Sequence, residues 1–207
     1  EPYLDAGIVN EDSNYDEYFW ETLNIAEGEN KGAIYSKTLK TEFHVATAMQ
    51  ISLKLNNEKV SVSHETNVKE KSLTYTYKLN VSEGDTATIY KYGSYVSSLN
   101  YKNNELIEAS FNNVQKAKDL GFEDLLKLQK QSWAEIWKTS DIIIEGDVKA
   151  QQGIRFNIFQ LNQTYLGTDA RLNIGPKGFT GEKYGGSTYW DTEAYCIPFY
   201  MGTKNSD

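Results

Sequence analysis

The sequence has little of what builds a disulfide or a metal centre. Cys196 is its only cysteine, which excludes an internal disulfide, and its two histidines, His44 and His64, form no cluster spaced for metal ligation. Nucleophilic catalysis by Cys196 would need an oriented base, and no motif identifies one. We therefore expect structural roles for these three residues, no metal, and a reducing compartment, most simply the cytoplasm.

Long apolar runs and clusters of basic residues are also missing. No stretch approaches the roughly 20 apolar residues that span a bilayer. The formal net charge is -8, and no basic stripe is present that would neutralise a phosphate backbone. Neither a membrane nor a nucleic acid is an expected partner. Because the chain begins at Glu1 rather than Met and stops at Asp207 without a recognisable structural ending, we expect it to be a piece of a longer protein.

Glycines are concentrated towards the C-terminus. Five of them lie in the twelve residues from Gly175 to Gly186, but the GxxxxGK[ST] and GxGxxG patterns of nucleotide-binding loops are absent. Glycine permits positive φ and a close approach of ligand to backbone, so this segment could border a binding site. Equally, the glycines could serve a pair of tight turns. No cofactor is expected.

An aromatic residue and a carboxylate follow this segment directly. The ring of Trp190 could stack on a sugar face, and Asp191 could accept hydrogen bonds from two adjacent hydroxyls. Alternatively, Asp191 or Thr192 caps a helix while Trp190 packs in a core. The residues alone leave both interpretations open. Asp191 and Glu193 make a poor acid/base pair, because side chains at i and i+2 do not share a helix face.

Alternating apolar and polar residues predict strands in the N-terminal half. The pattern is clearest over residues 43–55, which predict one long half-buried strand with apolar positions at Phe43, Val45, Thr47, Met49, Ile51, Leu53 and Leu55. A polar turn is predicted at residues 56–59, and alternation returns over residues 73–81. Antiparallel hairpins of a β-sandwich are the expected arrangement.

The apolar period becomes helical after about residue 101. One helix is predicted to end at Gly121, and a second is predicted over residues 122–137. After a turn at residues 146–147, Asp147 is the expected N-cap of a third helix that runs to about Thr164. Strands are therefore followed by two linking helices and then by the first helix of another domain.

Two long segments carry a resemblance to a known family. They are QQGIRFNIFQLNQTY (Gln151–Tyr165) and RLNIGPKGFTGEKYGGSTYWDTEAYCIPFYM (Arg171–Met201), and both closely resemble glycoside hydrolase family 65. NEDSNYDEYFW (Asn10–Trp20) is similar to that family's N-terminal sandwich, and WAEIWKTSDIIIEGD (Trp133–Asp147) is similar to its linker into the catalytic domain.

The resemblance implies an α+β multidomain fragment. Residues 1–102 would be part of an N-terminal antiparallel β-sandwich domain, and residues 103–146 a helical linker. Residues 147–207 would be the start of an incomplete (α/α)6 catalytic barrel. On this basis the general-acid glutamate and the phosphate-binding residues lie beyond the chain, so no catalytic residue is expected within it.

The resemblance also implies a function. Similar family members cleave an α-glucosidic disaccharide with inorganic phosphate and invert the anomeric centre, and the glycine-rich string looks most like the maltose-cleaving group. Trp190 and Asp191 match the residues that bind the glucosyl unit. Kojibiose, nigerose or trehalose are the alternative substrates, and a non-catalytic carbohydrate-binding module is the alternative from another class. We expect disaccharide and phosphate as partners, a homodimer for the full-length protein, and no catalysis by this chain alone.

Overall fold

The computed structural model describes residues 1–7, 19–175 and 187–204. Most of the Asn10–Trp20 segment and of the Gly175–Gly186 segment thus lies outside the described residues. The described chain divides into two compact units: the first contains residues 1–7 and 19–126, and the second contains residues 127–175 and 187–204. The boundary falls inside helix α2, and the three-part division at residues 102 and 146 stays a prediction.

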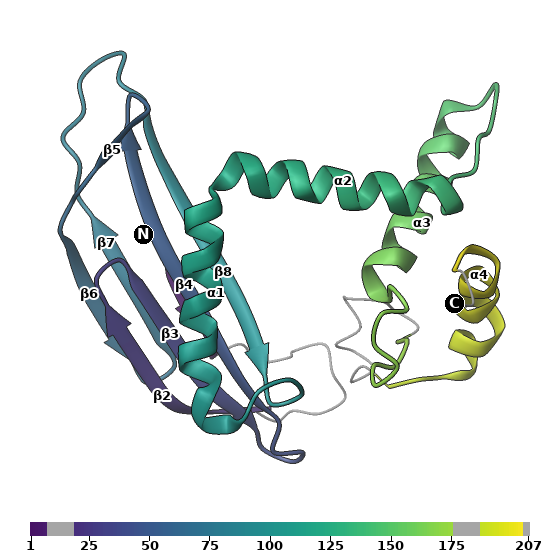
Figure 1. The fold of residues 1–207 in the computed structure, drawn as a ribbon, viewed down its shortest axis with the longest axis horizontal. Helices are drawn as coiled ribbons and strands as arrows, with labels where there is room; N and C mark the ends of the chain where they lie inside the picture. Colours follow the sequence, from purple (N-terminus) through teal and green to yellow (C-terminus); the bar gives the residue numbers. More distant parts are fainter. Residues whose placement is uncertain (8–18, 176–186, 205–207) are drawn as a thin grey trace. The chain divides into compact units, whose positions relative to one another are not determined.

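The first unit contains two antiparallel sheets (Figure 1). The smaller sheet has the strand order β1-β7-β6, with β1 at Tyr3–Asp5, β6 at His64–Lys69 and β7 at Ser72–Tyr77. The larger sheet has the order β2-β3-β4-β5, and β8 pairs with the other edge of β4. Its strands are β2 (Trp20–Gly28), β3 (Lys31–Thr38), β4 (His44–Leu55), β5 (Glu58–Val60) and β8 (Ala87–Ser97). The predicted antiparallel sandwich is confirmed.

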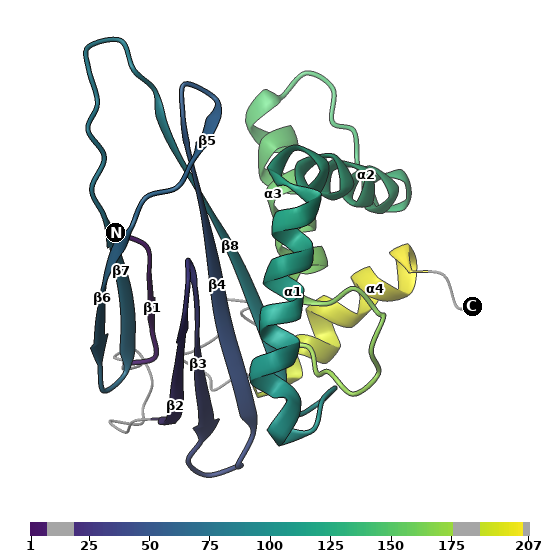
Figure 2. The same ribbon diagram turned by 60° about the vertical axis from the view of Figure 1, so that its left-hand side comes forward.

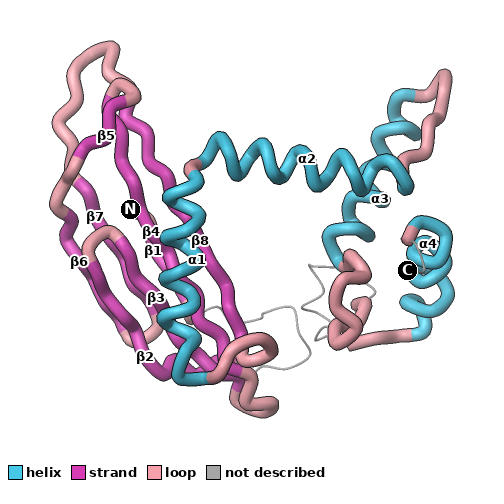
Figure 3. The backbone as a smooth tube through the Cα atoms, in the orientation of Figure 1, coloured by secondary structure: helices cyan, strands magenta, loops and turns pink. Residues whose placement is uncertain are grey.

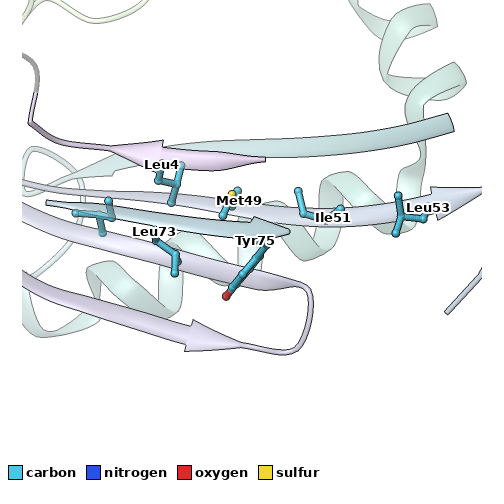
Figure 4. Close-up of a cluster of buried hydrophobic side chains, with 7 residues drawn as sticks. Leu4, Met49, Ile51, Leu53, Leu73 and Tyr75 are labelled. Carbon is cyan, nitrogen blue, oxygen red and sulfur yellow. The ribbon is translucent and has the colours of Figure 1, made fainter. Parts of the chain in front are cut away.

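Strand β4 is the centre of the larger sheet and matches the alternation in the sequence. Its odd-numbered side chains from Met49 to Leu53 face the smaller sheet, where they meet Leu4, Leu73 and Tyr75 (Figure 4). Leu73, Tyr75 and Met49 are fully buried. Burying such a large apolar side chain stabilises the fold by about 1.5–3 kcal/mol. This cluster is the main core of the unit.

The other face of β4 is covered as well, which the alternation did not predict. Helix α1 (Leu106–Leu120) lies across it, so the unit has three layers (Figure 2). Ala46 and Ala48 are completely buried against this helix, and the Gln50 amide donates to Gln115 Oε1 at 2.9 Å. The prediction of a half-buried strand is wrong, because short alanine side chains let the helix pack closely on the face expected to meet solvent.

Two local features set the geometry of the larger sheet. Asn56 and Asn57 have φ of 50° and 68°, so the β4–β5 turn has only two central residues, and Glu58 and Lys59 belong to β5 rather than to the turn. Gly32 faces the core where no side chain fits. A Cβ there would lie 2.1 Å from Leu73 Cδ2 and 2.9 Å from Tyr75 Oη.

The helices have the predicted caps. Gly121 ends α1 with a φ of 84°, and α2 spans Phe122–Ser140. Asp147 is the N-cap of α3 (Val148–Thr164), and its Oδ1 accepts the backbone N–H groups of residues 149 and 150 at 3.0 Å each. Helix α4 spans Ile197–Thr203. The described elements are thus strands up to residue 97 and helices after residue 102, an α+β chain (Figure 3).

In the second unit, helical segments pack through aromatic rings and polar contacts. The rings of Trp133 on α2 and Phe159 on α3 lie 4.8 Å apart. Arg155 forms a two-pronged ion pair with Asp141, at 2.9 Å and 2.6 Å. None of the described helices is long and apolar enough to cross a membrane.

Candidate functional site

Trp190 and Asp191 lie at the start of the last helical segment and reach solvent. Trp190 is 87% exposed, and Asp191 is exposed too. Asp191 has helical φ and ψ and forms no capping hydrogen bond with its side chain. Within the described residues, therefore, Trp190 is not a core residue and Asp191 is not a cap. Two consecutive residues thus expose an indole ring and a carboxylate to solvent.

The helix that follows these residues contains one wide turn. Segment η3 (Thr192–Cys196) is a π-helical turn, in which the N–H of Ile197 donates to the carbonyl of Thr192, five residues earlier. The cause is Pro198, which lacks an N–H and whose ring would clash with the carbonyl four residues earlier in a regular α-helix. Such insertions are frequent at functional sites.

Two hydrogen bonds join the ends of the glycine-rich segment. Thr192 is buried, and its Oγ1 donates to the Ile174 carbonyl at 2.9 Å. The Asn173 amide donates to Thr188 Oγ1 at 3.3 Å. The residues before and after the glycines are thus held together directly beside Trp190. From the sequence, Thr192 is a candidate only as a helix cap, and Asn173, Ile174 and Thr188 are not candidates at all. The available signal was the presence of polar residues at both ends of a glycine-rich segment.

Helix α4 is fixed to α3 by buried polar contacts. Tyr200 Oη donates to the Leu161 carbonyl at 2.7 Å, and burial raises the pKa of Tyr200 to about 12. Lys204 Nζ donates to Oδ1 of the fully buried Asn162 at 2.7 Å, and burial lowers the pKa of this lysine. The helix that begins near Trp190 is therefore anchored at its far end.

Two titratable groups in this part of the chain have shifted pKa values. Hydrogen bonds from the Arg171 side chain, at 2.9 Å and 2.6 Å, and from its backbone lower the pKa of Asp169 to about 2. Cys196 is buried, and burial followed by the negative charge of Asp191 raises the pKa of its thiol. The thiol therefore stays protonated at neutral pH, which agrees with a structural role.

The arrangement is suited to binding rather than to bond cleavage. It offers an aromatic face and an acceptor group, which together match the C–H face and hydroxyls of a sugar. Among the described residues, no group of three or more histidine, cysteine, aspartate or glutamate side chains is placed to hold a metal ion. Glu193 is exposed on the same helical segment, but its spacing from Asp191 does not suit an acid/base pair.

Comparison with known proteins assigns the family. The profile of the glycosyl hydrolase family 65 N-terminal domain matches residues 1–136, and that of the family's central catalytic domain matches residues 155–206. The chain is 39% identical over 206 residues to the maltose phosphorylase of Bacillus subtilis strain 168, covering 100% of this chain and 27% of that protein. The chain belongs to glycosyl hydrolase family 65.

Other relatives carry different substrate names. The α,α-trehalose phosphorylase of Thermoanaerobacter brockii is 38% identical over 174 residues, with coverage of 84% of this chain and 22% of that protein. Kojibiose and nigerose phosphorylases match as well. A solved structure of a candidate kojibiose phosphorylase from the human microbiome superposes with a TM-score of 0.81 at 27% identity, covering 96% of this chain and 25% of that one. The chain thus spans about a quarter of the length of these relatives.

Proposed function

We propose that this chain is the part of an inverting disaccharide phosphorylase that joins the N-terminal sandwich to the catalytic (α/α)6 barrel and binds the glucosyl unit. Membership of family 65 supports the phosphorylase activity, since the relatives that match over most of the chain are named as phosphorylases. The exposure of Trp190 beside Asp191 is the single observation that supports the binding role.

Each of the two residues has a distinct task in this proposal. The Trp190 indole stacks on the apolar face of the glucosyl ring, and the Asp191 carboxylate accepts hydrogen bonds from two adjacent hydroxyls. The bonds of Thr192 to Ile174 and of Asn173 to Thr188 hold the neighbouring backbone in place. In the transition state the glucosyl ring flattens towards an oxocarbenium ion. Hydrogen bonds from its hydroxyls to Asp191 that shorten at this point would stabilise the transition state more than the bound substrate.

Cleavage of the glycosidic bond requires groups other than Trp190, Asp191 and the residues that hold them. In an inverting reaction, a carboxylic acid protonates the leaving oxygen while a nucleophile attacks the opposite face of the sugar. Phosphate is already anionic and needs little help from a base. We propose inorganic phosphate as co-substrate, no cofactor, and no phosphorolysis by the 207-residue chain alone.

Maltose is the proposed substrate, with trehalose, kojibiose and nigerose as alternatives. The identities to maltose and trehalose phosphorylases, 39% and 38%, differ too little to separate them. Incubation of the protein encoded by the whole reading frame with each disaccharide and phosphate, followed by assay of glucose 1-phosphate, distinguishes the substrates. Equal turnover of trehalose and maltose would contradict the maltose assignment.

The binding role is tested by Trp190→Ala and Asp191→Asn. We expect each variant to lower kcat/KM of the whole protein by at least tenfold, because a lost stacking or charge-assisted contact costs about 1–3 kcal/mol. The melting temperature should change little, since Trp190 is 87% exposed. Tyr195→Ala, another aromatic on the same segment with 76% exposure, is the matched control. Equal kcat/KM in W190A and Y195A would argue against the role.

Assembly and location are proposed from the family resemblance. We propose a homodimer of the whole protein in the cytoplasm, with no nucleic-acid or membrane partner. Sedimentation equilibrium of the purified whole protein measures the dimer, and fractionation of the source cells measures its location. A monomer at micromolar concentration would contradict the first of these proposals.

A further inference from the structure

Trp190 and Asp191 are the two central residues of a hydrogen-bonded turn. The backbone N–H of Thr192 donates to the Tyr189 carbonyl at 3.0 Å, so this bond closes the chain around them. Both central side chains are exposed. The directions in which the indole and the carboxylate point therefore depend on how this turn is held.

Thr192 also holds the turn through its side chain. It is only 2% exposed, and its Oγ1 donates to the Ile174 carbonyl at 2.9 Å. The turn is thereby fixed to a segment 18 positions earlier, and not only to its own helix. The neighbouring bond from Asn173 to Thr188 is longer, at 3.3 Å, and exposed. Because water competes less with a buried hydrogen bond, Thr192 supplies the stronger constraint.

The wide helical turn keeps Thr192 on the buried face of its segment. Thr192, Cys196 and Tyr200 are spaced by four residues and are at most 8% exposed. In a regular α-helix four residues advance by about 400°, so the first and third of them would diverge by about 80°. The π-helical turn at Thr192–Cys196 has more residues per turn and reduces this divergence. The face that anchors α4 thus continues to Thr192.

The Asp191 carboxylate has no anchor of its own among the described residues. It forms no capping hydrogen bond, and no other described residue gives it a hydrogen bond or an ion pair. Asp169 differs, because the Arg171 side chain holds its carboxylate with two bonds. The position of the Asp191 carboxylate therefore depends on its backbone, and the nearest anchored residue is Thr192.

We propose that Thr192 is a positioning residue of the glucosyl site and acts through Asp191. The inference rests on the proposed function and adds a residue to that site. The buried hydroxyl holds the turn where the carboxylate meets two adjacent hydroxyls of the glucosyl unit, while Thr192 itself does not touch the sugar. Misplacing a binding group by about 1 Å can lower a rate by about a hundredfold, so the loss of this bond should be measurable in catalysis.

A double-mutant cycle on the protein of the whole reading frame tests the role, with kcat/KM as the measured quantity. Thr192→Val removes the hydroxyl and should lower kcat/KM about tenfold or more, whereas Thr192→Ser keeps it and should stay within about threefold of wild type. In the Asp191→Ala background, T192V should lower kcat/KM by less than about threefold, because the group that it positions is gone.

Thr203→Val is the matched control for T192V. Thr203 Oγ1 also donates to a backbone carbonyl, that of Phe199 at 2.8 Å, but this bond lies within α4 and reaches no other segment. The control loses the same chemical group from the same helical segment. Its kcat/KM should therefore equal that of wild type.

A purely structural role of Thr192 predicts a different result. Loss of folded protein would lower activity by the same factor in every background, so the effects of D191A and T192V would multiply. Multiplying effects, equal losses in T192V and T203V, or a T192S variant as impaired as T192V would each overturn the proposal.

Failure of the proposed function gives a separate result. Wild-type kcat/KM in both W190A and D191A would remove the glucosyl-binding role of this pair, and the role of Thr192 with it. A loss in D191A together with wild-type kcat/KM in T192V would contradict only the positioning role and leave the proposed function in place.

Discussion

In the first unit, strand β4 is enclosed on both faces, by Leu73 and Tyr75 on one side and by helix α1 on the other. In the second unit, the described buried apolar residues are only Ile158, Cys196 and Tyr200, while Val148, Met201 and Ile143 are at least 75% exposed. The second unit is held by ring contacts, such as that of Trp133 with Phe159, and by polar contacts, such as Arg155 with Asp141 and Lys204 with Asn162.

This difference predicts how stability is distributed. A continuous apolar core unfolds cooperatively, whereas exposed ion pairs contribute only about 0–1 kcal/mol each and are screened by salt. The first unit should therefore set the main unfolding transition of the chain. The second unit should open locally at lower free energy, with its large apolar side chains available to neighbouring protein.

Leu73→Ala removes a side chain from the apolar core of the first unit and should have the largest effect on stability. The side chain is fully buried between the two sheets, so the substitution should destabilise the chain by about 2–5 kcal/mol. Urea unfolding followed by far-ultraviolet circular dichroism measures this loss. A loss below about 1 kcal/mol would show that the first unit does not set the main transition.

Gly32→Ala tests the packing of the same core from the opposite strand. The new methyl group would overlap Leu73 and Tyr75, at a cost of about 1–3 kcal/mol. In the Leu73→Ala background this cost should shrink, because the closest atom is gone. Gly93→Ala is the matched control on β8, where a Cβ has nothing within 4 Å. Equal effects of G32A and G93A would contradict the overlap.

Asp147→Ala tests the lower local stability of the second unit. It removes the two N-cap hydrogen bonds of α3 and should cost the helix about 1 kcal/mol. Hydrogen exchange should show faster opening of residues 148–152, with strand amides of the first unit unchanged. Faster exchange across β4 and β8 together with α3 would mean that the two units unfold as one.

The titration of Asp169 should give the smallest effect. Its folded-state pKa of about 2 lies below the ordinary 3.8, so its ion pair is fully formed above the ordinary value and is lost as pH falls through about 2. In Arg171→Met, the Asp169 pKa should rise towards the ordinary value, as measured by carboxyl carbon chemical shifts. Arg155→Met removes a different pair and should leave the Asp169 titration unchanged.

Local patterns made much of the fold predictable. Helices α1 to α3 and strand β4 follow from apolar spacing, and the caps at Gly121 and Asp147 follow from local backbone chemistry. Strand β2 escaped prediction because its apolar residues do not alternate regularly, and its register shifts between Thr22 and Asn24. Trp190 and Asp191 are candidates from the sequence alone. The hydrogen bonds beside them were not predictable, because each joins residues far apart in the chain: 15 positions for Asn173 and Thr188, and 18 for Ile174 and Thr192.

The sequence by itself determined the family, the order of strands and helices, and the residue pair proposed to bind the glucosyl unit. Only the tertiary structure decided that the alanine face of β4 lies under α1 and that Thr192 bonds to Ile174. The physical reason is that periodicity and capping depend on neighbours within a few residues. Which surfaces meet is decided by contacts between distant segments, and these leave no period in the sequence.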